Sequence, residues 1–556
     1  MSSKRIYFNL FLIALFGLLL RLTCIDKPEG LWNDEYISWY ISSKPLFSAF
    51  MNEAYQNCHM PFYYVYLKFW TFLFGDSDLC LRISSVIPGF LCIIVSFFAG
   101  KELKDDKSGL MSAILVAISG FMIYFSQEVR FYGLLTLFSF LLVLFFLKLL
   151  KNRSLFNYLV FFLANVLIIL THTIGFVFVF FNLLFLFFYL KKQKLITNKP
   201  IILMSLGIIL TILPFASFIL KTMVSSYISQ FWSDFSMTKL FFVFADYISP
   251  IQINLINTPA GIKNLLFHKG NASIGYWLFA VIPLIIASVS IIYSLFRKNV
   301  QIILIFLSAF MTLFVTILAS MTGKIVLITK YTCEIYPAFI LIIAYGLTVL
   351  KPQFIKKIFT SALIGLSLFY LLVSPYAPQK AGRKEGHKLP ADLIKEEKLQ
   401  SDDIIVLLYY NANRFGKYID TDKYNIDSVT KYNFQYKLLF NPENHVEIIK
   451  NGKTIFLDDF KNGNNDILSE TLRTVIFAKM PPKTKFALVS LKTVSFIDET
   501  KIKKLVEKPK AYKRMPLLFL IFSHIANVIK KEADSNLKFI EKKSKGQWEI
   551  YVWEKD

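Results

Sequence analysis

Long apolar runs are the feature of this 556-residue sequence that most restricts its fold. A helix that crosses a hydrocarbon layer about 30 Å thick needs roughly 20 apolar residues, more than a helix of a soluble domain requires in succession. We therefore expect a polytopic α-helical membrane protein with about eleven membrane-spanning helices. The runs lie at 6–24, 83–100, 109–125, 131–150, 155–171, 173–190, 201–220, 275–296, 300–321, 331–350 and 354–374.

The basic residues fall in every second connection between these runs, and those connections are short. They are Lys4 and Arg5, Lys101 to Lys107, Lys148 to Arg153, Lys191 to Lys199, Arg297 and Lys298, and Lys351 to Lys357. Because Lys and Arg collect on the cytoplasmic side, the N-terminus is predicted inside and the long loops 25–82 and 221–274 outside. The same bias accounts for the net charge of +24 without nucleic acid, for which no aromatic and basic groove or zinc pattern is present.

The composition changes after residue 374, where Lys, Asp and Asn become frequent and the apolar runs shorten. Short β-branched and aromatic runs predict strands, and other segments have helical character. The predicted strands are 403–410, 454–459, 486–491 and 548–554, and the predicted helices are 470–479, part of 388–399, and a core or membrane-surface helix over 515–529.

We therefore expect two domains. Residues 1–374 form the transmembrane domain, with an outer loop over 25–82 that carries interfacial helices such as 61–74. Residues 375–556 form a soluble α/β domain, whose length suits a single domain. An odd number of spans places this C-terminal domain outside the cytoplasm.

Four groups of polar residues lie at the outer ends of the apolar runs. They are Asp34 with Glu35, His59, Glu128 with Arg130, and His172. Ionisable groups close to the hydrocarbon layer cost a few kcal/mol, and they are usually functional or paired. Their repeated occurrence at one face of the membrane predicts a functional site there.

Each group also has a simpler structural explanation. Asp34 and Glu35 could be solvated loop acids, and His59 could cap the helix that follows it. Arg130 could extend towards lipid phosphate, with its aliphatic stem along apolar surface. His172 could be an interfacial histidine with satisfied hydrogen bonds. Taken one at a time, these explanations compete with a functional one.

Sugar transfer from a lipid phosphate is the chemistry that best suits these side chains together. A base must take the proton of the incoming hydroxyl, and fixed cations or donors must stabilise the departing phosphate. Asp34 suits the first role. Arg130 suits the second, because a guanidinium grips phosphate through two hydrogen bonds. No P-loop, dinucleotide-binding glycine motif or Ser-centred elbow is present.

The ordered motifs resemble the bacterial GT-C glycosyltransferases of the protein O-mannosyltransferase and aminoarabinose transferase clan. The resemblance covers about residues 5–190. It rests on Asp34-Glu35, on His59-Met60-Pro61-Phe62-Tyr63-Tyr64, on Ser126-Gln127-Glu128-Val129-Arg130-Phe131-Tyr132, and on Thr171-His172-Thr173-Ile174-Gly175.

The resemblance implies an enzyme of the bacterial cytoplasmic membrane that acts on its outer, periplasmic face. The donor would be a polyprenyl-phosphate sugar held among membrane lipids, and the acceptor an extracytoplasmic glycan, glycolipid or protein. Asp34 would be the acid–base residue or a substrate-orienting carboxylate, with Glu35 beside it. His59 and Glu128 would lie near the donor phosphate and a candidate divalent metal, the one cofactor that the resemblance suggests.

Further residues carry the same implication. Arg130 and His172 would lie near the donor. Lys330-Tyr331 resembles the basic residue and tyrosine found near the lipid phosphate in this clan. The chain departs from the aminoarabinose type at Ile37, where that type has Arg, so lipid A phosphate is not implied as the acceptor.

Three other functions remain as alternatives. A transporter or flippase of lipid-linked sugars would need ionisable residues near the bilayer midplane and matched repeats, whereas the candidates here cluster at outer helix ends. An oligosaccharyltransferase would share the membrane architecture, but its W-W-D-type motif is absent from the soluble part. In a non-catalytic assembly protein, these acids would be loop residues without a catalytic role.

Overall fold

The computed structural model describes two compact units. The first comprises Met1–Asp26 and Ile37–Ala381, and the second comprises Lys27–Tyr36 and Gly382–Asp556. The described residues are 2–193, 199–224, 237–250, 277–321, 327–374, 377–380, 386, 388–397, 404–408, 417–418, 437–440, 446–450, 453–456, 473, 477–491, 526–545 and 548–556.

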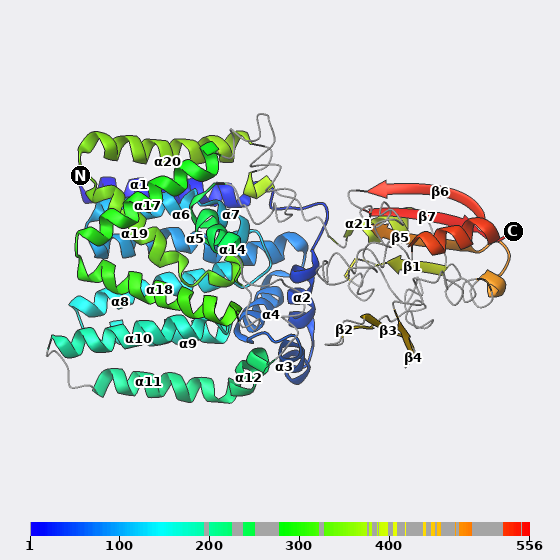
Figure 1. The fold of residues 1–556 in the computed structure, drawn as a ribbon, viewed down its shortest axis with the longest axis horizontal. Helices are drawn as coiled ribbons and strands as arrows, with labels where there is room; N and C mark the ends of the chain where they lie inside the picture. Colours follow the sequence, from blue (N-terminus) through cyan, green and yellow to red (C-terminus); the bar gives the residue numbers. More distant parts are fainter. Residues whose placement is uncertain are drawn as a thin grey trace. The chain divides into compact units, whose positions relative to one another are not determined.

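Helices make up most of the first unit (Figure 1). Within the described ranges, eight segments are long and apolar enough to cross a membrane. They lie on α1 (Ser3–Leu22), α5 (Asp78–Leu103), α8 (Tyr132–Lys151), α10 (Gly175–Lys192), α11 (Lys199–Ile212) with η1 (Leu213–Phe215) and α12 (Ala216–Val224), α17 (Ile282–Phe296) with the preceding η3 (Trp277–Val281), α18 (Val300–Met321) and α20 (Gln353–Val373).

Three further predicted runs also lie on helices. The pair α6 (Asp106–Ala117) and α7 (Gly120–Ser126) meets the same test together and bends by 58°. The other two runs are shorter apolar helices, α9 (Leu155–Thr171) and α19 (Tyr336–Val349). Each predicted apolar run therefore lies on a helix, and the polytopic membrane fold is confirmed.

Small residues allow the central helices of this unit to approach closely. Helix α5 packs against α6 and α8. A Cβ added at Gly100 would lie 2.7 Å from the carbonyl oxygen of Ser108, so only glycine fits there. Such contacts suit a membrane, where van der Waals packing rather than the hydrophobic effect drives helix association.

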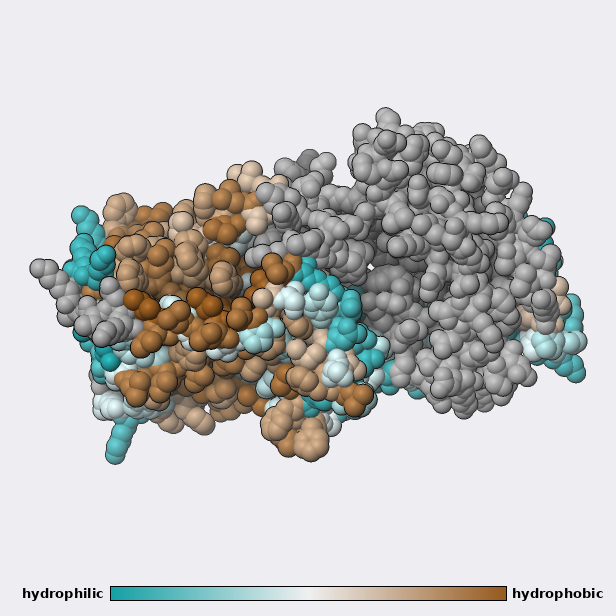
Figure 2. Space-filling view, turned by 90° about the horizontal axis from the view of Figure 1, so that it is seen from below, coloured by the Kyte–Doolittle hydropathy of each residue, from teal (hydrophilic) through white to brown (hydrophobic). Residues whose placement is uncertain are grey.

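Exposed apolar side chains cover the outside of the helical unit. Phe8 and Phe11 of α1 are among them, and Figure 2 shows hydrophobic residues over most of the helical surface on the face drawn. The opposite extreme is α8, of which almost every side chain is buried. The hydroxyl of Thr136 in this helix donates to the Tyr132 carbonyl, which satisfies it without water.

Three short helices follow α1 in the first long loop, namely α2 (Asn33–Ser43), α3 (Phe47–Gln56) and α4 (Phe62–Phe74). The predicted helix over 61–74 is α4. It buries Tyr63 and Tyr64 and exposes Phe69 and Phe72. A two-sided helix of this kind, with aromatic residues on the exposed face, is typical of one that lies in the membrane interface.

The second unit contains a mixed four-stranded sheet in the order β1-β5-β7-β6. Strand β1 (Ile404–Leu408) runs parallel to β5 (Lys485–Leu491), whereas β7 (Trp548–Glu554) and β6 (Lys538–Lys545) add antiparallel. A three-stranded antiparallel sheet holds β2 (Lys437–Phe440), β3 (Val446–Lys450) and β4 (Lys453–Phe456). The shorter elements are α21 (Lys388–Glu396), η8 (Phe477–Lys479) and a helix over 526–536.

All four strands predicted for this region are present, as β1, β4, β5 and β7, so the soluble α/β fold is confirmed. Strand β7 is buried on both faces along most of its length, through Trp548, Ile550, Val552 and Trp553. The helix predicted near 388–399 is α21. Most of the predicted helix 470–479 and the stretch 515–525 lie outside the described residues.

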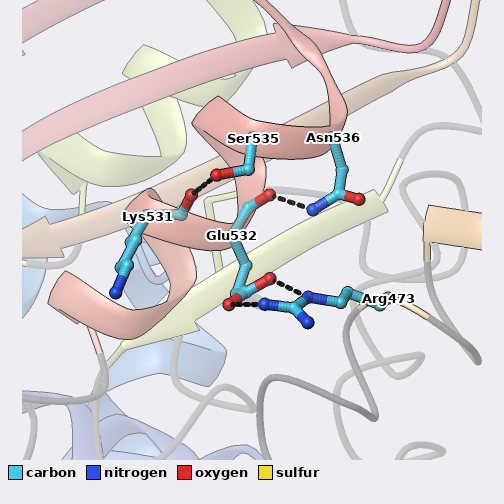
Figure 3. A network of polar contacts seen from close by, with 5 residues as sticks. All are labelled: Arg473, Lys531, Glu532, Ser535 and Asn536. Carbon is cyan, nitrogen blue, oxygen red and sulfur yellow. Dashed lines mark hydrogen bonds and ion pairs between the residues drawn. The ribbon is translucent and has the colours of Figure 1, made fainter.

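An ion pair joins the helix 526–536 to a distant segment of the second unit (Figure 3). Arg473 donates from Nε and Nη2 to the two carboxylate oxygens of Glu532, at 2.5 and 2.8 Å. The Glu532 side chain is almost fully buried. A bidentate pair of this kind fixes orientation as well as charge.

Candidate functional site

Six of the eight predicted site residues lie in the first unit, where the structure brings them towards one cluster. The cluster involves the turn after α7, the junction between α9 and α10, the start of α4, and the 3-10 turn η4 (Thr329–Thr332) before α19. Asp34 and Glu35 belong to the second unit.

The turn after α7 carries Glu128 and Arg130. The backbone N–H of Arg130 donates to the Glu128 carbonyl at 2.7 Å, which makes the turn tight. The preceding Gln127 donates from Nε2 to the carbonyls of Arg21 and Thr23, at 2.9 and 2.7 Å. The turn is therefore anchored to the C-terminal end of α1. Glu128 and Arg130 are 1% and 4% exposed.

A second anchor of this turn is the buried guanidinium of Arg21. Its Nη1 donates to the carbonyls of Gly17 and Ala117, at 2.8 and 3.2 Å, and its Nη2 donates to Val116 at 3.0 Å. Its Nε donates to Ser126 Oγ at 3.2 Å. Val116 and Ala117 end α6, so Arg21 satisfies carbonyls that the bend leaves without helical partners.

Arg130 lies inside the unit. Its Nη1 donates to Ser38 Oγ at 3.3 Å, and its guanidinium carbon lies 5.2 Å from the ring centroid of Phe131. This burial differs from a side chain that extends along apolar surface to the lipid phosphates, which was the structural explanation considered from the sequence.

His172 ends α9 and stacks between two rings. Its ring centroid is 4.9 Å from that of Phe131 and 5.8 Å from that of Tyr331. Lys330 Nζ lies 5.4 Å from the same Tyr331 ring. Burial of the imidazole, with a smaller contribution from Arg130, lowers the pKa of His172 to about 3, so the ring is neutral at physiological pH.

His59 contacts the tyrosines that open α4. Its Nδ1 lies 2.6 Å from the hydroxyl of Tyr64. The N-cap position of α4 is occupied by Pro61, so His59 does not cap this helix. The Tyr63 ring lies 5.4 Å from Tyr64 and 6.3 Å from Phe131.

A continuous row of rings therefore joins the predicted residues of the first unit. We call it the aromatic row, and its members in spatial order are His59, Tyr64, Tyr63, Phe131, His172 and Tyr331. Charged groups accompany it, since the guanidinium carbon of Arg130 lies 5.2 Å from the Phe131 ring centroid and Lys330 Nζ lies 5.4 Å from that of Tyr331. Fixed cations beside rigid rings can hold an anion without reorganisation.

Glu334 is a buried acid outside the predicted site residues. It lies between η4 and α19, is 0% exposed, and neither carboxylate oxygen has a hydrogen-bond partner among the described residues. The available signal was an acid inside the predicted apolar run 331–350.

Asp34 and Glu35 lie in the first turn of α2. Glu35 is buried, and its Oε2 accepts a hydrogen bond from the Trp32 N–H at 3.2 Å. This is the reciprocal bond of a capping box, in which the third helical residue satisfies the N–H that precedes the helix. Asp34 is half-buried. Glu35 is therefore not a solvated loop acid.

Comparison with known proteins gives one family and a set of similar structures. Residues 58–218 match the family model described as dolichyl-phosphate-mannose-protein mannosyltransferase. The structure of ArnT from Cupriavidus metallidurans in the apo state aligns with a TM-score of 0.50 and 10% identity, over 99% of this chain and 98% of that chain. The same protein bound to undecaprenyl phosphate aligns equally well, with the same identity and coverage.

The chain has the GT-C fold. The resemblance to the protein O-mannosyltransferase and aminoarabinose transferase clan, predicted from the ordered motifs, is confirmed. The family match begins at Cys58, so it includes His59, Glu128, Arg130 and His172. Among curated proteins, none matches this sequence.

A divalent metal was the one cofactor suggested for a GT-C protein of this kind, with His59 and Glu128 as candidate ligands. Within the described part of the chain, no group of three or more His, Cys, Asp or Glu side chains is placed to hold a metal. The Nδ1 of His59 is engaged with the Tyr64 hydroxyl. These residues do not fit a metal site by themselves, and we derive no step through one.

The cluster in the first unit also contains residues that the sequence did not predict as site residues. Tyr63, Tyr64 and Phe131 complete the aromatic row, and Ser38 accepts from Arg130. The three aromatic residues fall inside the motifs that carry the resemblance, so their positions were a usable signal. Ser38 had none, because a serine in an ordinary helix is unremarkable.

Proposed function

We propose that this protein is a membrane glycosyltransferase that moves a sugar from a polyprenyl-phosphate donor to an extracytoplasmic acceptor, which is a glycan, a glycolipid or a protein. The observation that carries the proposal is the placement of two cations, Arg130 and Lys330, beside rings of the aromatic row in the first unit. The GT-C fold and the match to a family of mannosyltransferases support it.

The donor phosphate is assigned to the cationic side chains. Arg130 offers a planar fork that matches a phosphate, and Lys330 adds a point charge. Negative charge grows on the phosphate as the bond between it and the sugar breaks, so both cations act on the transition state. The ArnT structure with undecaprenyl phosphate supports a lipid phosphate as the ligand. His172, being neutral, contributes a ring face rather than charge.

Asp34 is assigned the role of base. It takes the proton of the acceptor hydroxyl while the acceptor oxygen bonds to the anomeric carbon and the lipid phosphate departs. Asp34 and Ser38 are four residues apart in α2, and Ser38 accepts from Arg130. Glu35, through its bond to the Trp32 N–H, is assigned to hold the first turn of that helix.

Replacement of Asp34 tests the proposal. The Asp34→Asn variant, purified and returned to membranes, should turn over a labelled polyprenyl-phosphate sugar roughly 10²–10⁴-fold more slowly than the wild type. This is the range expected for loss of a general base. Asp26→Asn is the matched control, because Asp26 is exposed and lies outside the proposed machinery. Near-normal turnover by Asp34→Asn, with the control also active, would remove Asp34 from the base role.

The donor assay also separates the alternatives. An oligosaccharyltransferase would require a diphosphate-linked donor and would leave the monophosphate-linked sugar untouched. A transporter or flippase would move the labelled lipid between leaflets of proteoliposomes without releasing sugar from it. Mass spectrometry of glycans and glycolipids from cells with and without the protein would then name the product.

A further inference from the structure

Ten residues of the first long loop pack with the C-terminal domain. Residues Lys27–Tyr36 form one compact unit with Gly382–Asp556, although both chain neighbours of this segment belong to the helical unit. The segment contains Asp34 and Glu35. The residues that hold this segment follow it by more than 300 positions in the sequence, and we call them its seat.

Two hydrogen bonds hold the backbone of this segment. The N–H of Leu31 donates to the hydroxyl of Tyr418 at 2.6 Å, and the N–H of Lys388 donates to the carbonyl of Glu29 at 3.1 Å. Leu31 is 0% exposed. A buried N–H that lost its partner would cost about 1–3 kcal/mol, so the Tyr418 hydroxyl is a required acceptor at this place.

The backbones approach so closely that two glycines are needed. Gly30 has a φ of +75°, and a Cβ there would lie 2.5 Å from Lys388 Cβ and 2.8 Å from the Tyr418 hydroxyl. A Cβ on Gly386 would overlap the carbonyl of Glu29. Glycine at both positions permits a contact that any side chain would push apart.

This contact lies immediately before the proposed base. The turn at Gly30 is closed by its N–H to the Lys27 carbonyl at 3.0 Å, and α2 begins three residues later at Asn33. Asp34 is in the first turn of α2, which Glu35 holds through the Trp32 N–H. The C-terminal domain therefore holds the chain immediately before the first turn of α2.

We propose that the C-terminal domain positions the Asp34 segment for reaction, with Tyr418 as the positioning residue and Gly386 providing the close approach. The inference rests on the proposed function of Asp34 as base. It assigns the C-terminal domain a part in turnover rather than only a part in solubility or acceptor binding. Misplacement of a reacting group by about 1 Å can cost on the order of 10²-fold in rate.

The experiment uses the full-length protein and two variants that loosen the seat in different ways. Tyr418→Phe removes the acceptor of the Leu31 N–H, and Gly386→Ala forces the backbone of Glu29 away. Tyr551→Phe is the control for a lost hydroxyl, because Tyr551 donates to Glu549 elsewhere in the same unit. Gly365→Ala is the control for an added methyl, since nothing lies within 4 Å of a Cβ there.

Hydrogen–deuterium exchange provides a readout that does not depend on activity. We expect the amides of residues 30–36 to exchange at least about tenfold faster in both variants, as a buried amide does when its local opening becomes easier. Exchange in the membrane helices should stay unchanged, and both controls should match the wild type. Unchanged exchange in residues 30–36 of both variants would overturn the proposed seat.

Kinetics then test the positioning role. With a labelled polyprenyl-phosphate sugar, kcat of Tyr418→Phe should fall about 10-fold, on the scale of a small misplacement, while KM for the donor stays constant. Faster exchange with unchanged kcat would overturn positioning, even if Asp34→Asn is inactive. If Asp34→Asn retains activity but both seat variants lose kcat, the proposed base fails while the dependence on the C-terminal domain stands.

Discussion

The ring of His172 stacks on the ring of Phe131, with 4.9 Å between their centroids. This packing buries an imidazole beside the Arg130 guanidinium, and it lowers the pKa of His172 to about 3. An unfolded histidine takes up its proton near pH 6.5, whereas the folded one stays neutral down to about pH 3. Stability is therefore fully present above pH 6.5 and is lost as the pH falls towards 3.

The His172→Gln variant should not show this loss of stability at low pH, because glutamine does not take up a proton there. We expect the melting temperature of the variant to fall less than that of the wild type between pH 6.5 and pH 4.5, as measured by intrinsic fluorescence in detergent. His172 is only half-buried, so the effect will be smaller than full burial would give. Parallel curves for variant and wild type would contradict the assignment.

Arg130 is expected to contribute to turnover through charge and shape together. Arg130→Gln should lower kcat by roughly 10²–10³-fold, the cost of removing one stabilising contact to a developing anion. Arg130→Lys should recover part of it, because the charge remains but the planar fork is lost. Arg5→Gln, which changes an exposed residue of α1, is the control. Equal activity of Arg130→Gln and the control would remove Arg130 from the site.

Arg21 is expected to act on stability. Arg21→Met leaves the carbonyls of Val116 and Ala117 without their donors, and each buried unsatisfied group costs about 1–3 kcal/mol. We expect a loss on the order of 3 kcal/mol in thermal unfolding, with a lower yield of folded protein. Arg5→Met should behave as wild type. An unchanged melting temperature would mean that water or the chain replaces the guanidinium.

The location of the C-terminal domain can be tested with a fusion. Alternating basic loops predict that residues 375–556 lie outside the cytoplasm. A reporter that is active only after export, fused after Asp556, should therefore be active, and a reporter that is active only in the cytoplasm should not. The reverse pattern would place one fewer or one more span in the chain.

The sequence by itself determined the class of fold and predicted a candidate site. Apolar length and β-branched alternation are local properties, so they placed the membrane helices and the strands β1, β4, β5 and β7 within a few residues. His59, Glu128, Arg130 and His172 were visible for a related reason, since an ionisable residue at the end of an apolar run is costly without a purpose.

Only the tertiary structure decided which side chains meet. The stack of His172 on Phe131 and Tyr331 joins three segments, and no local pattern specifies it. Leu31 meets the Tyr418 hydroxyl across 387 positions of sequence. Such contacts depend on which faces of distant elements pack together. Hydropathy carries no information about this packing, because it is read one short window at a time.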